Sequence, residues 1–302
     1  MSRFHAFQRL TAPFFHSATM TGDSLLGNKR FMMGSLIVSI IIFVCVFAPF
    51  LTTHKPNDID MLNIEAAPSI QHWLGTDTLG RDVFSRLLYG GRVSILVGLA
   101  AVGLQIFIGV ILGVIAGYGS PCIDSIIMRI SEVFQCFPFY PTAITMAAVF
   151  GASIWNVVVI IGLLQWPGIA RLIRSEVLSL KERSYIEYSQ AIGVSKIRII
   201  LDGLLRNCVP VIVVNASLAV TGAILAEAAL SFLGLGVTQP NSSWGNMLSA
   251  AQNFRILSYE PWMWVPPGLA IVLLVLSVNI IGEALQDHMR PRFSYIRDIN
   301  FK

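Results

Sequence analysis

The residue types that most often carry out chemistry are present in this sequence, but their spacing assembles no catalytic or metal site. The four cysteines lie far apart along the chain, and no pair has the spacing of metal ligands. They are Cys45, Cys122, Cys136 and Cys208, and we interpret them as small apolar packing residues. The five histidines are equally scattered, and no HExxH, GxSxG or paired-carboxylate signature occurs. The sequence therefore predicts no metal site, no cofactor and no intramembrane enzyme, which would need such a constellation.

The stretch GTDTLG, residues 75–80, is the nearest approach to a phosphate-binding loop. A nucleotide-binding loop of that kind ends in Gly-Lys-Ser/Thr, because its lysine and backbone amides hold the phosphates. Here the second glycine is followed by Arg81 and Asp82. The chain is therefore not expected to bind or hydrolyse a nucleotide by itself.

The composition places the elements around these residues in a membrane. Hydrophobic residues make up 55% of the chain and charged residues only 13%, with a mean hydropathy of +0.69, whereas soluble domains carry about 25% charged residues. The net charge of +4 does not point to nucleic acid, because the basic residues flank apolar runs and form no basic face with aromatics. The first thirty residues lack the apolar core of a cleavable signal peptide, so the first apolar run is expected to stay as an anchor.

Six apolar segments reach or approach the roughly 20 residues that a membrane-crossing helix needs. They are residues 31–51, 93–118, 126–150, 154–170, 209–236 and 262–281. Pro138 and Pro141 in the third segment, and Pro266 and Pro267 in the sixth, predict kinks. The sequence therefore predicts an all-α membrane protein with six transmembrane helices.

The orientation follows from the lysines and arginines that flank the six segments. The side that holds both termini and residues 171–207 carries 15 of them, whereas the other side carries 5, with Arg129 left out because it lies inside a segment. Since cytoplasmic loops carry the excess of basic residues, both termini and residues 171–207 are predicted to be cytoplasmic.

The predicted organisation has four parts. They are a cytoplasmic tail (1–30), a first span with an external segment (31–92), a core of five spans (93–290) and a second cytoplasmic tail (291–302).

Residues 171–207 are unusually charged for this chain, with seven basic and four acidic residues. A connection between two spans needs only a few residues, so a segment of this length is expected to do more than turn. The pattern predicts a helix over 175–190, a left-handed turn at Gly193, an N-cap at Ser195 and a second helix over 196–206. Apolar residues gather around the turn and favour a partner surface. They are Ile186, Ala191, Ile192, Val194 and Ile197.

The stretch EYSQAIG with the downstream ILDGLL resembles the EAA loop of ABC-importer permeases. Glu187, Gly193 and Leu205 match that pattern, whereas Tyr188 and Ser189 replace its two alanines. Arg206 stands where the family has a proline. Three further stretches, HWLGTDTLGRDVFSRLLYGGRVSI, EAALSFLGLGV with SSWGNML, and WVPPGLAIVLLVLSVNIIGEALQDHMRPR, are similar to the second permease subunit of oligopeptide, dipeptide and nickel importers. The resemblance covers about residues 31–292.

This resemblance implies a type I ABC importer permease in a bacterial inner membrane. It implies four protein partners besides membrane lipid: a second homologous permease, two cytoplasmic ATP-binding subunits and an extracytoplasmic solute-binding protein. The solute implied is an oligopeptide or dipeptide, with nickel or a metal chelate as the alternative. The residues implied to couple the permease to the ATPases are Glu187, Tyr188, Ser189, Ala191, Ile192, Gly193 and Leu205.

Two charged features remain open from the sequence. A carboxylate deep in a span costs roughly 2.5–3.5 kcal/mol, so Glu227 is expected to line the translocation path, to pair with a neighbouring subunit, to be protonated, or to lie near the outer interface. The external segment 52–92 is either a cap that shapes the gate or meets a binding protein, or a structural clasp held by an ion network of Arg81, Asp82 and Arg86. An ATP-independent transporter is the alternative of another class. It predicts charged coupling sites in several spans or paired broken helices, whereas only Glu227 lies deep in a span and no internal repeat is detected.

Overall fold

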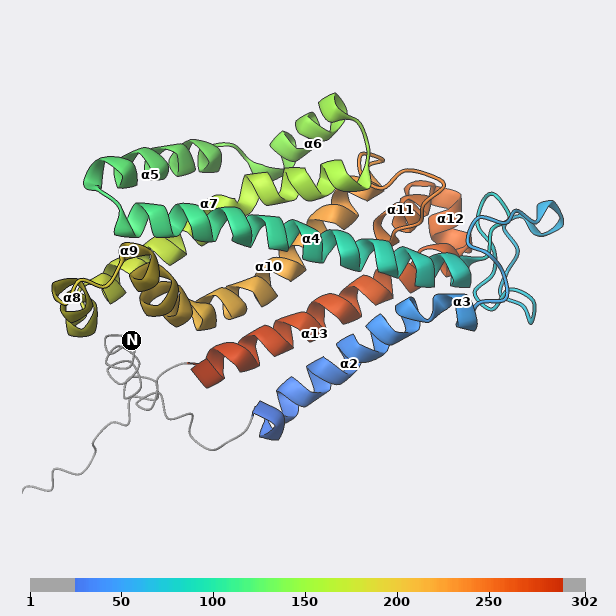
Figure 1. Cartoon of the computed structure of the whole chain (residues 1–302). Helices are drawn as coiled ribbons and strands as arrows, with labels where there is room; N and C mark the ends of the chain where they lie inside the picture. Colours follow the sequence, from blue (N-terminus) through green and yellow to red (C-terminus); the bar gives the residue numbers. More distant parts are fainter. Residues whose placement is uncertain (1–24, 290–302) are drawn as a thin grey trace, which may run out of the picture.

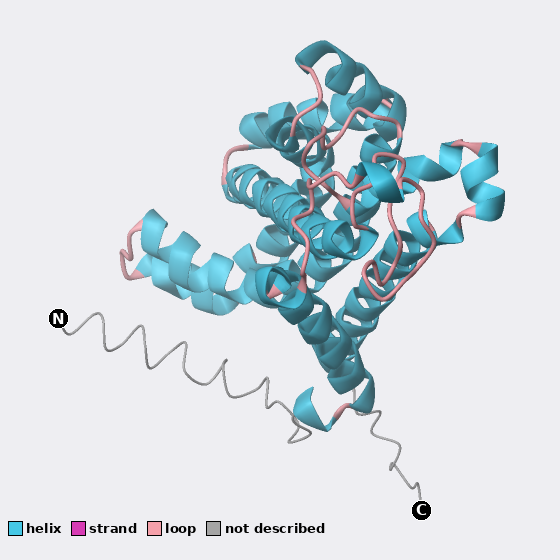
Figure 2. Cartoon of the chain, turned by 90° about the vertical axis from the view of Figure 1, so that its right-hand side faces the viewer, coloured by secondary structure: helices cyan, strands magenta, loops and turns pink. Residues whose placement is uncertain are grey.

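The computed structural model describes residues 25–289, which form helices joined by loops and no strand (Figures 1 and 2). Both predicted tails lie wholly or mostly outside these residues. The long helices are α2 (Lys29–Val46), α4 (Val83–Tyr118), α5 (Pro121–Cys136), α6 (Phe139–Phe150), α7 (Ile154–Lys181), α10 (Arg206–Phe232) and α13 (Val265–Met289). The short ones are η1 (Leu25–Gly27), α3 (Ala48–Leu51), η2 (Met61–Asn63), α8 (Ser184–Ala191), α9 (Lys196–Arg198), the π-helical η3 (Ile199–Leu205), α11 (Trp244–Leu248), η4 (Ser249–Gln252), α12 (Phe254–Tyr259) and η5 (Pro261–Met263).

The long helices run along one another and separate two sets of connections. The segment with α8 lies at one end of the bundle, and α3, α11, α12 and residues 52–82 lie at the other (Figure 1). We call these the α8 end and the α12 end. Within residues 25–289, five helices are long and apolar enough to cross a membrane, and α5 with α6 makes a sixth if that bent pair counts as one span. The predicted all-α fold with six spans is confirmed in this form.

Helices α4 and α7 make the most extensive contact in the bundle. Glycines on α4 recur every four residues, at Gly109, Gly113 and Gly117, and each meets the α7 backbone and a β-branched side chain. A Cβ added at Gly113 would lie 2.6 Å from the Ala170 carbonyl oxygen and 2.8 Å from the Ile173 Cβ. Small residues at this spacing let two membrane helices approach until their backbones nearly touch. The two helices therefore form a tightly packed pair that extends to the α8 end.

The third predicted span is not one helix. Helices α5 and α6 meet at Phe137 and Pro138 and differ in direction by 87°. Proline lacks the backbone N–H and disfavours a helical conformation in the preceding residue, and Phe137 is accordingly extended. The kink predicted at Pro138 is confirmed, and residues 126–150 form two helices rather than one continuous helix.

The prolines predicted to kink the sixth span have a different role. Pro266 and Pro267 lie in the first turn of α13, which begins at Val265. Backbone N–H groups there have no partner within the helix, so proline is tolerated. These two residues start the helix rather than bend it, and the predicted kink is wrong.

Two helices are longer than the apolar runs that predicted them. Helix α7 continues to Lys181, eleven residues past the predicted end of the fourth span. On the other side, α9, η3 and α10 join into one helical stretch, 196–232. The charged segment 171–207 therefore consists mostly of the ends of two spanning helices. Charged residues do not end a helix where it emerges from the apolar region.

The packing role predicted for the cysteines holds for two of the four. Cys45 and Cys208 are buried in apolar clusters. Cys122 and Cys136 are exposed at the two ends of α5.

Candidate functional sites

The first candidate site is the segment between α7 and α9, residues 182–195, which we call the α8 segment. Its central helix α8 ends in a left-handed turn, with Gly193 at φ +77°. The Gly193 N–H donates to the Gln190 carbonyl at 3.0 Å, and the Val194 N–H donates to the Ser189 carbonyl at 3.0 Å. These two bonds form the Schellman motif, which satisfies the last carbonyls of a helix. The predicted turn at Gly193 is confirmed, whereas Ser195 precedes α9 without a capping bond from its side chain.

The inner face of α8 is fastened to the two spanning helices. Ile186 is completely buried in an apolar cluster with Val177 of α7 and Leu204 of η3. The Tyr185 hydroxyl donates to the Gly203 carbonyl at 3.1 Å. Because an aliphatic side chain and a hydrogen bond both cross to η3, α8 has a defined angle to both spans.

The outer face of α8 carries most of the residues predicted to couple to an ATPase. Glu187, Tyr188, Ala191 and Gly193 are exposed, with Tyr188 at 51%. Ile192 and Leu205 are half-buried, whereas Ser189 is buried and donates to the Tyr185 carbonyl at 2.6 Å.

The apolar group predicted around the Gly193 turn is divided by the fold. Ile186 points inward, whereas Ile197 is 72% exposed. The exposed apolar surface of this end therefore centres on Tyr188, Ala191 and Ile197. Contact of these residues with an ATPase stays a prediction.

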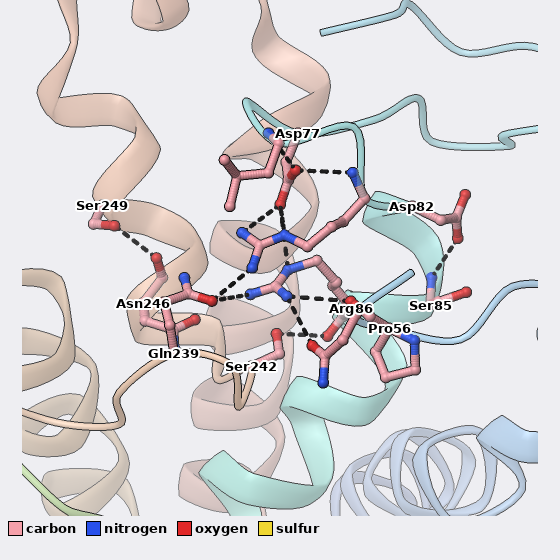
Figure 3. Close-up of polar contacts among 12 residues, drawn as sticks. Pro56, Asp77, Asp82, Ser85, Arg86, Gln239, Ser242, Asn246 and Ser249 are labelled. Atoms are coloured by element: carbon pink, nitrogen blue, oxygen red, sulfur yellow. Dashed lines mark hydrogen bonds and ion pairs between the residues drawn. The ribbon is translucent and has the colours of Figure 1, made fainter. Parts of the chain in front are cut away.

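The second candidate site lies at the α12 end, where two arginines share one aspartate. Arg81 Nη2 lies 2.7 Å from Asp77 Oδ2, and Arg86 Nε lies 3.5 Å from the same oxygen. Both guanidinium groups also reach Gln239 Oε1, at 2.6 Å from Arg81 and 3.5 Å from Arg86 (Figure 3). We call these four residues the Asp77 network. It joins the start of α4 to the chain after α10, 158 residues away in sequence.

The predicted ion network of Arg81, Asp82 and Arg86 is therefore wrong in one member, because the aspartate that binds both arginines is Asp77 and not Asp82. Asp82 is the N-cap of α4 and accepts from the Ser85 N–H at 2.7 Å. Its other oxygen lies 2.9 Å from His72 Nδ1. An aspartate immediately before a helix binds the free N–H groups of the first turn, so Asp82 is directed away from the arginines.

A cavity of about 500 Å³ adjoins the Asp77 network. Its polar lining includes Arg81, Arg86 and Gln239, and its apolar lining includes Val83 and Met263. The structure thus places charged, amide and apolar groups around one space at the α12 end.

A further polar cluster holds residues 52–82 against α12. Arg255 lies 2.6 Å from a carboxylate oxygen of Glu65 and is also paired with Glu260. Burial raises the pKa of Glu260 above its usual value, the nearby Glu65 carboxylate adds to this, and Arg255 opposes it. The ion pairs explain how a long connection with little regular structure keeps one position.

Glu227 lies inside the bundle, at the junction of α4, α10 and α11. It is 0% exposed, and its two carboxylate oxygens accept from Ser94 Oγ at 2.9 Å and Ser231 Oγ at 2.7 Å. Ser94 Oγ in turn accepts from the Trp244 N–H at 3.1 Å. Neither described cavity is lined by Glu227, so these contacts favour a packing role, and a place on the translocation path stays a prediction.

Residues 109–295 match the family described as binding-protein-dependent transport system inner membrane component, and residues 21–68 match the N-terminal transmembrane domain of oligopeptide transport permease C. The chain belongs to this permease family. It is 40% identical to a protein of Brucella suis biovar 1 named as a peptide permease, over 93% of this chain and 92% of that one. It is 40% identical to a dipeptide transport system permease of Alkalihalophilus pseudofirmus (88% and 86% covered) and 35% identical to the oligopeptide transport system permease of Bacillus subtilis (91% and 91% covered).

The fold of the permease is similar to that of a chain of the methionine ABC transporter MetNI in inward-facing conformations. The TM-score is 0.54 at 18% identity, over 68% of this chain and 97% of the other. The resemblance to ABC-importer permeases and the assignment to a multi-pass inner-membrane protein are both confirmed.

Several residues that shape the permease's candidate sites were missed by sequence reasoning. The sequence predicted no role for Asp77 apart from its place in GTDTLG, and none for Gln239, Ser94 or Ser231. A signal was present for Ser231, because it follows Glu227 by four residues and so lies on the same helix face. No local signal existed for Gln239, whose partners are more than 150 residues away.

Proposed function

We propose that this permease is one of two permease subunits of an ATP-driven importer of oligopeptides or dipeptides. The relatives named above carry these solutes in their names, at 35–40% identity over most of both chains. A second, homologous permease would supply the other half of the translocation path. An extracytoplasmic solute-binding protein would deliver the solute, and two cytoplasmic ATP-binding subunits would drive the transport.

The observation that carries the coupling mechanism is the attachment of the α8 segment to two spanning helices at once. Ile186 packs against the end of α7 and against η3, which continues into α10. A push on the exposed residues Glu187, Tyr188 or Ala191 would therefore move both spans as a rigid body. Only residues 182–183 separate α8 from α7, and only residues 192–195 separate it from α9, so little of the movement would be lost.

The excess of basic residues supports an orientation with the α8 end in the cytoplasm and the α12 end outside. Segment 171–207 alone carries seven lysines and arginines. All the external connections of the six-span topology together carry 5. In this orientation the α8 segment faces the ATPases, and the cavity beside the Asp77 network faces the side from which solute arrives.

The proposal is tested with the complete importer in proteoliposomes, where uptake of labelled di- and tripeptides is compared with uptake of nickel. We expect peptide uptake that requires ATP, the binding protein and this permease. Uptake of nickel but no peptide would favour the alternative cargo, and peptide uptake without ATP or ATPase subunits would contradict an ATP-driven importer.

A further inference from the structure

The cavity at the α12 end has unbalanced charge. Its charged lining residues are Arg81, Arg86 and Asp77, two cations against one anion. The Arg81 and Arg86 residues are only 8% and 2% exposed. A buried guanidinium group that lacks its own anion is unfavourable, because the low-dielectric interior does not replace the water it has lost.

Arg86 is the less satisfied of the two. Arg81 makes short contacts to Asp77, with its Nε at 2.8 Å and its Nη2 at 2.7 Å from Oδ2. Arg86 approaches the same oxygen only to 3.5 Å. It also meets the Pro56 carbonyl at 3.2 Å, the Asn57 Oδ1 at 3.4 Å and Gln239 at 3.5 Å. All four contacts are longer than the roughly 2.7–2.9 Å of a good charge-assisted hydrogen bond. The arrangement leaves Arg86 able to bind a further anionic oxygen.

The rest of the lining fits a peptide better than an inorganic anion. Gln252 and Asn253 contribute amide side chains, and Val83, Ile256 and Met263 contribute an apolar wall. The volume of about 500 Å³ is in the range of roughly 300–1,000 Å³ that small-molecule sites have. The two arginines could bind the carboxylate of a short peptide, the amide side chains could bond to its backbone, and the apolar wall could contact its side chains.

We propose that this cavity binds the free C-terminal carboxylate of a short peptide, with Arg86 and Arg81 as the carboxylate-binding residues. The proposal rests on the proposed peptide-import function and adds a solute site on the permease itself, apart from the binding protein. A peptide released at the α12 end would be held by its carboxylate before it enters the space between the two permeases.

The test is equilibrium binding of radiolabelled trialanine and of trialanine amide to the complete permease–ATPase complex in nanodiscs, without the binding protein. We expect the free acid to bind at least tenfold more tightly than the amide, which corresponds to about 1.4 kcal/mol. Arg86→Gln should abolish this preference. Lys55→Gln is the matched control, because Lys55 is an exposed cation at the same end and does not line the cavity.

A second pair of variants leaves both arginines in place. Thr78 is an exposed residue of the cavity lining, so Thr78→Glu would bring a competing carboxylate to the arginines, whereas Thr78→Gln has the same size without charge. We expect only Thr78→Glu to weaken trialanine binding, by at least tenfold. Equal binding of acid and amide to the wild-type complex, or equal effects of the two Thr78 variants, would overturn the proposal.

Two further readouts separate the possible failures. If peptide-loaded binding protein stimulates ATP hydrolysis by the same preparation while acid and amide bind equally, the cavity proposal fails and the import function stands. If Thr78→Glu weakens docking of the peptide-free binding protein but leaves trialanine binding unchanged, the carboxylate belongs to that protein. That result also overturns the proposal.

Discussion

Ile186 of α8 rests on Gly203 of η3 so closely that a Cβ added to Gly203 would lie 2.9 Å from the Ile186 Cδ1. The contact joins a short helix outside the predicted membrane region to the start of a spanning helix. Because Ile186 is fully buried, its side chain fixes the distance between α8 and the spans.

Truncation of this contact should loosen the α8 segment. Ile186→Ala removes a fully buried aliphatic side chain, which typically costs about 2–5 kcal/mol. We expect ATP hydrolysis by the assembled importer to respond less to peptide-loaded binding protein, because α8 would move without moving α10. Val209→Ala is the control, since Val209 is a 50% exposed aliphatic residue of α10 that is not part of that cluster. Equal coupling in the two variants would show that α8 does not need this anchor.

The turn at Gly193 provides a second test of coupling. Gly193 has φ +77°, and nothing lies within 4 Å of a Cβ built there, so a substitution acts through backbone strain alone. A β-branched residue in this region costs of the order of 1–3 kcal/mol, whereas asparagine tolerates it. We expect Gly193→Val to reduce uptake and ATPase association at normal membrane abundance, and Gly193→Asn to remain close to wild type.

A milder variant separates the loss of a surface contact on α8 from the strain at the Gly193 turn. Glu187→Ala removes an exposed side chain of α8 and leaves the turn unchanged, so its loss of uptake should be smaller than that of Gly193→Val. Wild-type uptake by Gly193→Val would mean that the α8 segment is only a connection between two spans.

Much of this architecture could be predicted from sequence, because a run of about 20 apolar residues has few alternatives to a membrane helix. The turn at Gly193 was also predictable, since a glycine between two helical patterns is the usual left-handed residue. The length of α7 was not, because Arg171, Arg174 and Lys181 look like loop residues although they continue the helix.

The Asp77 network shows where sequence reasoning stops. Asp82 is adjacent to Arg81 in sequence, but the helix start at Val83 requires it as a cap. Asp77 is placed beside both arginines by the turn of residues 77–81, in which its side chain accepts from the Leu79 and Arg81 N–H groups. Gln239 is brought there by the packing of α10 on α4. Such partners depend on tertiary structure and have no local signature.

Removal of the shared carboxylate should destabilise the α12 end. Asp77→Asn keeps the size of the side chain but leaves two buried guanidinium groups without an anion, and loss of one partner of a buried pair costs roughly 3–5 kcal/mol. We expect a lower melting temperature of the purified complex, with partial recovery in the Asp77→Asn/Arg81→Gln double variant. Asp58→Asn, an exposed aspartate of the same segment, should have no effect. If the double variant showed no recovery, the lower melting temperature of Asp77→Asn would not be due to unbalanced charge.

The orientation of the permease can be tested by thiol labelling. Ile70 is 95% exposed at the α12 end, and Ser184 is exposed at the start of α8. In a chain without its four native cysteines, an impermeant maleimide on intact spheroplasts should label Ile70→Cys and spare Ser184→Cys. Both should react after the membrane is permeabilised. Labelling of Ser184→Cys alone in intact spheroplasts would invert the topology and place the α8 segment away from the cytoplasm.

Glu227 allows a packing role to be distinguished from a role on the translocation path. Its two oxygens are the acceptors for Ser94 and Ser231, whose own oxygens already accept from the backbone N–H groups of Trp244 and Val237. Glu227→Ala would leave two buried hydroxyl groups without an acceptor, at about 1–3 kcal/mol each.

If packing dominates, Glu227→Ala should lower the melting temperature and the membrane abundance of the complex, and Glu227→Gln should do so less because it keeps one acceptor. Ser94→Ala should cost less in the Glu227→Ala background than in the wild type, since only the bond from the Trp244 N–H to Ser94 Oγ then remains to be lost; this is the non-additivity expected of residues in contact. Glu283→Ala, an exposed acid on α13, is the control for loss of charge alone. Normal stability and abundance of Glu227→Ala together with lost uptake would instead place this carboxylate on the path of the solute.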